Sequence, residues 1–155
     1  MPPSLLRHLP KHEGTGRAAA LIHGTVADLE PPFRGGERYI LFGAAQGQHV
    51  SPTSQQAKAW IEAGASYVCA WGNLAEEVET SFDFATFLPE LGPPLAYTLM
   101  TTSHAKKSVE EALWFAFYCA SAPDDLEAEL NRVVIVANTT QIQKQCESWV
   151  ITNAE

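Results

Sequence analysis

The sequence predicts a single α/β domain, a Rossmann-like three-layer sandwich on a mostly parallel sheet of about four to five strands. Apolar runs rich in β-branched and aromatic residues alternate with stretches of helical periodicity, and this alternation is typical of βαβ units. A chain of 155 residues, 46% hydrophobic and 18% charged, suits one globular domain with a real core. We expect the domain to span residues 38–155, after an N-terminal lead-in segment of residues 1–37.

Buried strands are expected wherever a short apolar run is bounded by turn residues. Within the main domain they cover residues 38–45, 66–72, 95–102 and 132–138. The lead-in holds one further candidate, "AAALIHGTV", at residues 18–26. Parallel strands need long crossover connections, so helices are expected between them.

Helices are predicted between the strands and at the end of the chain. The start signals are Ser51 as an N-cap before Pro52, and Ser108 with Glu111 in the spacing of a capping box. Gly64 supplies a stop for the first helix. The predicted helices lie within residues 51–65, 74–88, 108–120 and 139–150. The second is ambiguous, because "SFDFATF" also alternates as a strand does.

The net charge of −8 is concentrated in the later part of the chain. Between residues 76 and 129 there are eleven acidic residues and only two basic ones, Lys106 and Lys107. A negative field of this kind repels phosphate backbones and anionic lipid heads, and it attracts basic protein surfaces. We therefore expect neither nucleic acid nor a membrane as a partner, and we expect another protein with a basic surface.

The sequence favours a cytoplasmic location. The N-terminus, "MPPSLLRHLPKHEG", carries prolines and charges where a secretory segment would be apolar. No apolar run reaches the ~18 residues needed to span a bilayer. Cys69, Cys119 and Cys146 are odd in number and show no CxxC pairing, which indicates reduced thiols rather than a disulfide framework.

Polar side chains gather where the predicted parallel strands end, and ligands bind beyond the carboxyl ends of such strands. The candidate ligand-binding residues there are Asn73, Thr102, His104 and Thr139. In an enzyme, His104 with Thr101 and Thr102 would be the catalytic residues. Turn residues that bond their own backbone explain the same pattern, and we favour that explanation.

Sequence motifs for specific chemistries are missing. No P-loop or dinucleotide fingerprint occurs, and the stretch 101–108 has no glycine with which to enclose a phosphate. Cys69 lies in a predicted buried strand, and no GxSxG elbow occurs. His8 and His12 have i, i+4 spacing, but Pro10 lies between them. We therefore predict no metal and no cofactor.

Residues 112–120, "ALWFAFYCA", are apolar on every side of the expected helix. A surface helix normally shows a polar stripe, so this one is either enclosed by its own domain or covered by a partner. Because aromatic side chains anchor many interfaces, we expect Trp114, Phe115 and Tyr118 to form one. Two segments could cover the exposed side of this helix. One is a second copy of the chain, which would give a homodimer, and the other is residues 1–37 folded back over the helix.

Three stretches, "AWIEAGASYVCAWG", "LMTTSH" and "EEALWFAFYCA", together resemble a family of small bacterial domains of unknown function. The shared features are an Ala-Trp-Gly strand end, a Met-Thr-Thr-x-His strand end and a Trp-Phe-containing helix. The resemblance extends over residues 57–138, and Ser103 stands where the family usually has tryptophan. It implies the α/β fold and no established activity.

The function that these observations favour is a non-catalytic cytoplasmic protein-binding domain, of an immunity-type or accessory role, that uses an acidic surface and an aromatic helix. The alternative is a small hydrolase, or a small-molecule- or nucleotide-binding enzyme, with its site at the C-terminal edge of the sheet. The shape of that edge separates the two. A closed turn capped by Ser108 favours the binding domain, and an open pocket at His104 favours the enzyme.

Overall fold

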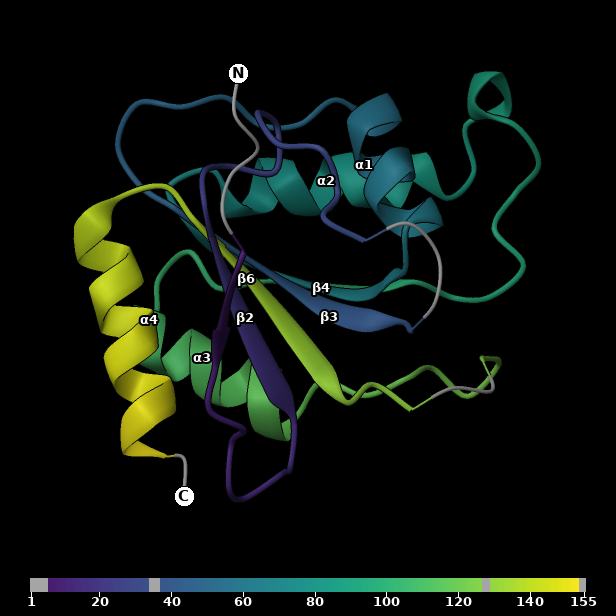
Figure 1. Ribbon diagram of the computed structural model, residues 1–155. Coiled ribbons are helices and arrows are strands. Elements are labelled where there is room, and N and C mark those ends of the chain that lie inside the picture. The colour runs from purple at the N-terminus through teal and green to yellow at the C-terminus, as the bar shows by residue number, and fades with distance from the viewer. Residues whose placement is uncertain (1–5, 34–36, 127–128, 154–155) are drawn as a thin grey trace.

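The structure, a computed structural model, describes residues 6–33, 37–126 and 129–153. These residues form a six-stranded sheet, four α-helices and one short 3-10 helix (Figure 1). The strand order is β1-β2-β6-β3-β4-β5, and every neighbouring pair is parallel except β1 with β2. The predicted α/β class and mostly parallel sheet are confirmed, and the sheet is larger than expected.

The described elements correspond closely to the predicted ones. The strands are β1 Arg7–Leu9, β2 Ala18–His23, β3 Tyr39–Ala45, β4 Ala65–Gly72, β5 Met100–Ser103 and β6 Arg132–Ala137. The helices are α1 Ser54–Glu62, α2 Ala75–Ala85, η1 Pro89–Leu91, α3 Val109–Tyr118 and α4 Thr140–Thr152. The ambiguous segment 74–88 is therefore helical over most of its length.

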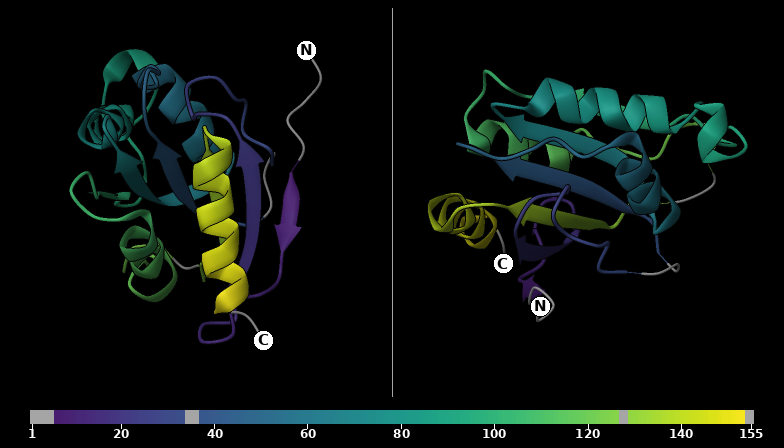
Figure 2. Two further views of the ribbon diagram at one scale, coloured as in Figure 1. Left: turned by 90° about the vertical axis from the view of Figure 1, so that its left-hand side faces the viewer. Right: turned by 90° about the horizontal axis from the view of Figure 1, so that it is seen from above.

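Helices cover both faces of the sheet, which gives three layers (Figure 2). Helices α1 and α2 lie on one face, and α3 and α4 lie on the other. Each face has its own apolar cluster, one with Phe42 and Phe117 and the other with Leu41 and Trp60. Neighbours in β3 thus point to opposite buried faces, which is why this strand is apolar without alternation.

The start of α1 differs from the prediction. Thr53, not Ser51, is the N-cap: its Oγ1 accepts a hydrogen bond from Gln56 N at 3.1 Å, and Gln56 Oε1 accepts one from Thr53 N at 2.8 Å. This pair forms a complete capping box, which outcompetes the lone serine before Pro52. Gly64 follows the helix with φ +124°, as a stop signal requires.

Strand β5 is also shorter than the predicted strand 95–102. Residues before Met100 lie outside the ladder, because their polar groups bond elsewhere: Leu95 N donates to Thr86 O at 3.0 Å, and Thr98 N donates to Asp125 Oδ2 at 2.9 Å. The first half of the apolar run 95–102 is therefore fixed by hydrogen bonds to loop residues, and only its second half forms a strand.

Residues 1–37 contribute to the sheet from Arg7 onward. Strand β2, the candidate at 18–26, pairs with β6 in parallel and with β1 in antiparallel orientation. Ala19 and Leu21 belong to the apolar cluster that lies under α3 and α4. The sheet therefore continues across the boundary predicted at residue 37.

Candidate functional site

The usual ligand crevice of this architecture is closed by a side chain. The chain runs from β3 through β4 to β5 and then returns to place β6 between β2 and β3, so the topological switch point lies between β3 and β6. Asn138, directly after β6, spans this point. Its Oδ1 accepts from Gln46 N at 3.1 Å, and its Nδ2 donates to Gln46 O at 2.9 Å. The carboxyl ends of β3 and β6 are thus tied together.

His104 is packed inside the turn that follows β5. Its Nε2 lies 2.9 Å from Thr102 Oγ1, and its ring centroid lies 4.8 Å from that of Phe115 on α3. Burial, and secondly the charge of Lys107, lower the pKa of His104 below its usual value. The imidazole is therefore neutral at pH 7 and already has a hydroxyl partner.

The other residues predicted at the strand ends also have local partners. Thr101 Oγ1 donates to Asp83 Oδ1 of α2 at 2.7 Å. Asn73 Nδ2 donates at 3.0 Å to a backbone carbonyl of the loop after β3. Thr139 is the N-cap of α4, where its Oγ1 accepts from Ile142 N at 3.1 Å. Each polar group supports a neighbouring loop or helix, as turn residues do.

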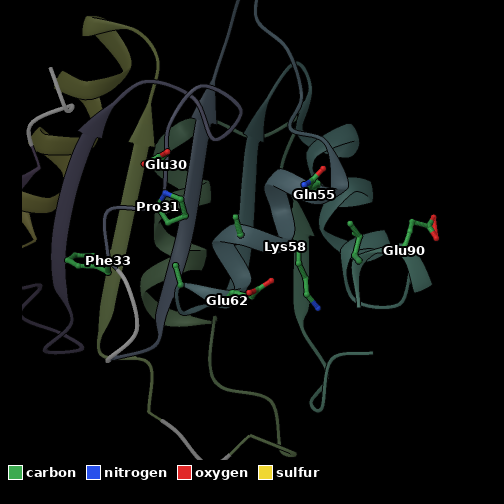
Figure 3. Close-up of a pocket in the computed structure, with 10 residues that line it drawn as sticks. Glu30, Pro31, Phe33, Gln55, Lys58, Glu62 and Glu90 are labelled. Atoms are coloured by element: carbon green, nitrogen blue, oxygen red, sulfur yellow. The ribbon is translucent and has the colours of Figure 1, made fainter. Parts of the chain in front are cut away.

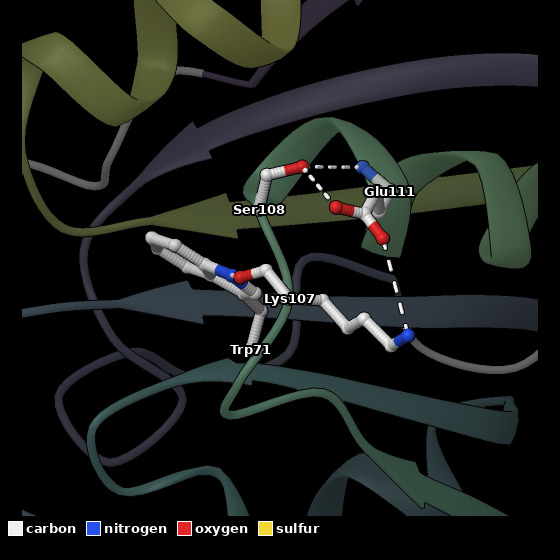
Figure 4. Close-up of polar contacts among 4 residues, drawn as sticks. All are labelled: Trp71, Lys107, Ser108 and Glu111. Carbon is white, nitrogen blue, oxygen red and sulfur yellow. Dashed lines mark hydrogen bonds and ion pairs between the residues drawn. The ribbon is translucent and has the colours of Figure 1, made fainter.

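The turn between β5 and α3 is closed by contacts among four residues (Figure 4). Ser108 Oγ accepts from Glu111 N at 3.1 Å and donates to Glu111 Oε1 at 3.3 Å. The predicted N-cap is confirmed, but the Glu111 carboxylate bonds the Ser108 hydroxyl and not its backbone N–H, so the capping box is incomplete. Lys107 Nζ lies 4.0 Å from Glu111 Oε2, and Trp71 Nε1 donates to Lys107 O at 2.7 Å. The Glu111 amide is thus capped within the chain, and the carboxylates of Glu110 and Glu111 in the first turn of α3 disfavour an anion there.

The cavity at this edge of the sheet is small, and the cysteine thiol in β4 is poorly reactive. A cavity near the ends of β3 and β4, lined by Gly43 and Trp71 among others, has a volume of about 20 Å³, room for a single water. Burial raises the pKa of the Cys69 thiol to about 12, so this sulfur is a poor nucleophile. Within the described ranges, no group of three or more His, Cys, Asp or Glu side chains could hold a metal ion.

A larger hollow lies on the other face, between α1, η1 and the segment 30–33 (Figure 3). Its volume is about 700 Å³ and it is open to solvent. Lys58, Glu62 and Glu90 stand at its rim, and Phe33 lies on its opposite side. Sequence reasoning missed this hollow because three segments far apart in the chain build it.

The predicted interface residues of α3 divide into two groups. Trp114 and Tyr118 stack on each other with ring centroids 5.5 Å apart and are 52% and 46% exposed. Phe115 instead packs inward, 6.2 Å from the Tyr67 ring and 4.8 Å from His104. The face toward the sheet is buried and consists of Ala112, Leu113, Ala116 and Phe117. We call Trp114 and Tyr118 the α3 aromatic pair.

A guanidinium from the loop between β1 and β2 caps the end of α3. Arg17 Nη1 donates to Ala116 O and to Phe117 O, both at 2.9 Å, and Nη2 donates to Ala120 O at 2.5 Å. Carbonyls in the last turn of a helix lack partners within the helix, so a cation is favourable there. The described part of residues 1–37 therefore covers the C-terminal end of α3 and reaches Tyr118 through His12. It does not cover the aromatic side chains as the fold-back considered above would, because Trp114 and Tyr118 remain 52% and 46% exposed.

His12 in the same loop is fully buried among aromatic rings. Its ring stacks on Trp149 at 5.5 Å and lies 4.9 Å from both Phe117 and Tyr118. His12 Nδ1 accepts from Thr15 N at 3.2 Å, which places the ring proton on Nε2, and Nε2 has no hydrogen-bond partner among the described residues. Burial, and secondly a neighbouring guanidinium, lower the pKa of His12.

Comparisons with known proteins place the chain in a family. The sequence profile of a domain of unknown function (DUF7684) matches residues 21–152, which run from β2 to α4 and extend beyond the resemblance seen over residues 57–138. No curated protein and no solved structure matches the chain. Among the helices of the described ranges, none is long and apolar enough to cross a membrane. The chain belongs to this family of domains of unknown function.

Proposed function

We propose that the protein is a non-catalytic protein-binding domain that docks a basic partner protein through the α3 aromatic pair. The observation that carries this proposal is the exposed, mutually stacked pair of Trp114 and Tyr118 on a helix whose opposite face is buried. Tryptophan and tyrosine offer large contact areas with few rotatable bonds, and they dominate the binding energy of many interfaces.

The charges around α3 determine the kind of partner. Glu110 and Glu111 lie in its first turn, and Asp124 and Asp125 lie just beyond its C-terminal end. Of the bases near α3, Lys107 pairs with Glu111, and Arg17 is bonded to carbonyls at the C-terminal end of the helix. A partner with an apolar pocket rimmed by Lys and Arg satisfies both requirements, and long-range attraction would speed the encounter. A small acidic domain that covers a basic surface suits an immunity-type or accessory role.

Closure of the sheet edge supports binding over catalysis. His104 is bonded to Thr102, Asn138 ties the ends of β3 and β6, and Ser108 caps α3. His104 is accordingly assigned a structural role. His104→Ala is expected to keep the fold and the partner, and a measurable turnover that this substitution abolished would reverse the assignment.

The test compares two exposed aromatic pairs. Tagged protein captures its partner from cell extract, mass spectrometry identifies it, and calorimetry with the purified partner gives the Kd. Trp114→Ala with Tyr118→Ala should raise the Kd at least ~100-fold, because truncated anchor residues commonly lose ~30-fold each. Phe84→Ala with Phe87→Ala is the matched control, since these rings are 45% and 53% exposed and also contact each other. A Kd unchanged in the α3 variant contradicts the proposal.

A second copy of the chain is the competing occupant of the α3 aromatic pair. A second copy would present the same acidic surroundings, with Glu110 and Glu111 before the pair and Asp124 and Asp125 beyond it, so a twofold contact would bring like charges together and a basic partner is favoured instead. Sedimentation of the wild type and of the Trp114→Ala, Tyr118→Ala variant separates the two. A wild-type dimer that the substitutions dissociate assigns the pair to a homodimer, whereas a monomer at high micromolar concentration leaves it for another protein.

A further inference from the structure

We propose that strand β5 is a docking edge to which an extended, lysine- or arginine-bearing segment of a partner protein adds as a further strand. This proposal concerns the edge of the sheet and goes beyond the function proposed above. It holds whether or not the α3 aromatic pair binds a partner.

The backbone of β5 presents free hydrogen-bonding groups. Among the described strands, β5 is last in the sheet and pairs only with β4. His104 N donates to Ala70 O at 2.8 Å, and with the register Ala70↔Ser103 this bond fixes which groups point toward β4. The backbone groups of Thr102 point inward, and those of Thr101 and Ser103 point outward. Within the described ranges, these outward N–H and C=O groups have no hydrogen-bond partner. Such an edge is a template for strand addition.

The side chains of β5 place carboxylates beside one face of this edge. Thr101 and Ser103 share the α2 face, because successive side chains of a strand alternate. Thr101 Oγ1 donates to Asp83 Oδ1 at 2.7 Å, and Glu79 precedes Asp83 by one turn on α2. One carboxylate of α2 is thus held against the edge on this face, and a second lies one helical turn away.

The α3 face of the edge has an open groove with an acidic wall. The groove has a volume of about 480 Å³, and its lining includes Tyr67, Met100 and the segment 121–125. Asp125 fixes this segment beside the start of β5, because its Oδ2 accepts from both Thr98 N and Thr98 Oγ1 at 2.9 Å. The side chain of Met100 is 40% exposed and can contact an added strand.

Charge complementarity selects the occupant. Carboxylates flank the edge on both faces, with Glu79 and Asp83 on one and Asp124 and Asp125 on the other. An added strand sends its side chains alternately to these two faces, so lysines or arginines meet a carboxylate on either of them. A second copy of β5 would instead bring like charges together, which is unfavourable in a cross-strand pair.

The test uses the whole protein and a short capped peptide that alternates lysine and valine. We expect saturating peptide to slow amide hydrogen exchange at Thr101 and Ser103 by tenfold or more, on the order of the protection that a sheet hydrogen bond gives. A glutamate–valine peptide and a lysine–valine peptide N-methylated at every second amide should give no protection. Unchanged exchange at millimolar lysine–valine peptide, or equal protection by the acidic peptide, overturns the proposal. Protection at Thr101 that rises with protein concentration alone would assign the edge to a second copy and overturn it as well.

Three variants, one with a single substitution and two with double substitutions, check the geometry and the charge. Thr101→Pro removes an outward N–H and leaves the ladder to β4 intact, so it should abolish peptide binding. Glu79→Gln with Asp124→Asn should raise the peptide Kd about fivefold, whereas Asp28→Asn with Glu62→Gln removes the same charge elsewhere and should leave it unchanged. If Thr101→Pro fails to fold, the charge variants and the N-methylated peptide still test whether the peptide adds to β5 as a strand. Equal Kd values in the two charge variants contradict the proposed edge.

Discussion

Substitution of Arg17 tests whether the N-terminal loop is an integral part of the domain. Its guanidinium donates hydrogen bonds to three carbonyls at the end of α3, namely Ala116 O, Phe117 O and Ala120 O. Arg17→Met keeps the aliphatic length and removes all three donors. The carbonyls would then bond to water or remain without partners, and the loop would lose its attachment to α3.

The expected cost follows from the number of bonds and their exposure. A hydrogen bond from a charged donor contributes ~1.5–3 kcal/mol when it is buried, and water that replaces the donor reduces this contribution. For three bonds of a half-buried side chain, we expect Arg17→Met to lower the free energy of unfolding by about 3 kcal/mol. In a domain of this size, that change corresponds to a fall in Tm of about 6–12 °C. Arg17→Lys should lie between the variant and the wild type, because an ammonium reaches fewer carbonyls.

Urea unfolding followed by circular dichroism measures the change, and Arg7→Met is the matched control. Arg7 Nη1 lies 3.2 Å from Glu147 Oε2 in a surface ion pair, so its loss should cost less than ~1 kcal/mol. If Arg17→Met were no more costly than Arg7→Met, the attachment of the loop to α3 would not stabilise the domain and the reasoning would be refuted.

Three further predictions concern pH, capping and salt. The pKa of His12 is lowered below 6.5 in the fold, so its contribution to stability is fully present above pH 6.5 and is lost as pH falls below that value. His12→Phe should therefore reduce the loss of unfolding free energy between about pH 7 and pH 5, and parallel wild-type and variant curves would contradict this. Ser108→Ala removes the N-cap of α3 and should cost about 1 kcal/mol in urea unfolding, where a cost below experimental error would dismiss the cap. The association rate with a basic partner should fall as ionic strength rises, and a flat rate in stopped-flow measurements would remove the acidic surface from the account.

Local patterns predicted the main elements because their causes are local. β3, β4 and β6 are short apolar runs between turn residues, and Ser108 with Glu111 is a cap whose parts lie three residues apart. The 112–120 stretch is apolar on every side, so its helical form could be predicted, but its division into a buried face and an exposed aromatic pair could not.

The missed features depend on contacts between distant segments. Arg17 lies 99 residues from Ala116, and no periodic pattern in the sequence signals their contact. The candidate residues at the strand ends could be named, but their partners could not. The bond from Thr101 to Asp83 and the tie between Asn138 and Gln46 arise only when the strands are placed side by side. The sequence therefore does not distinguish a sheet edge with free polar side chains from one whose polar side chains are already bonded to neighbouring loops.

Hydroxyl-radical footprinting with the purified partner tests the central claim most directly, because it maps the docking surface on the unaltered protein. In the free protein, Trp114 and Tyr118 are 52% and 46% exposed, and Phe84 and Phe87 are 45% and 53% exposed, so all four rings should be labelled. With saturating partner, we expect labelling of the α3 aromatic pair to fall severalfold while labelling of Phe84 and Phe87 stays constant. Unchanged labelling of Trp114 and Tyr118 in the complex would contradict the proposed docking surface.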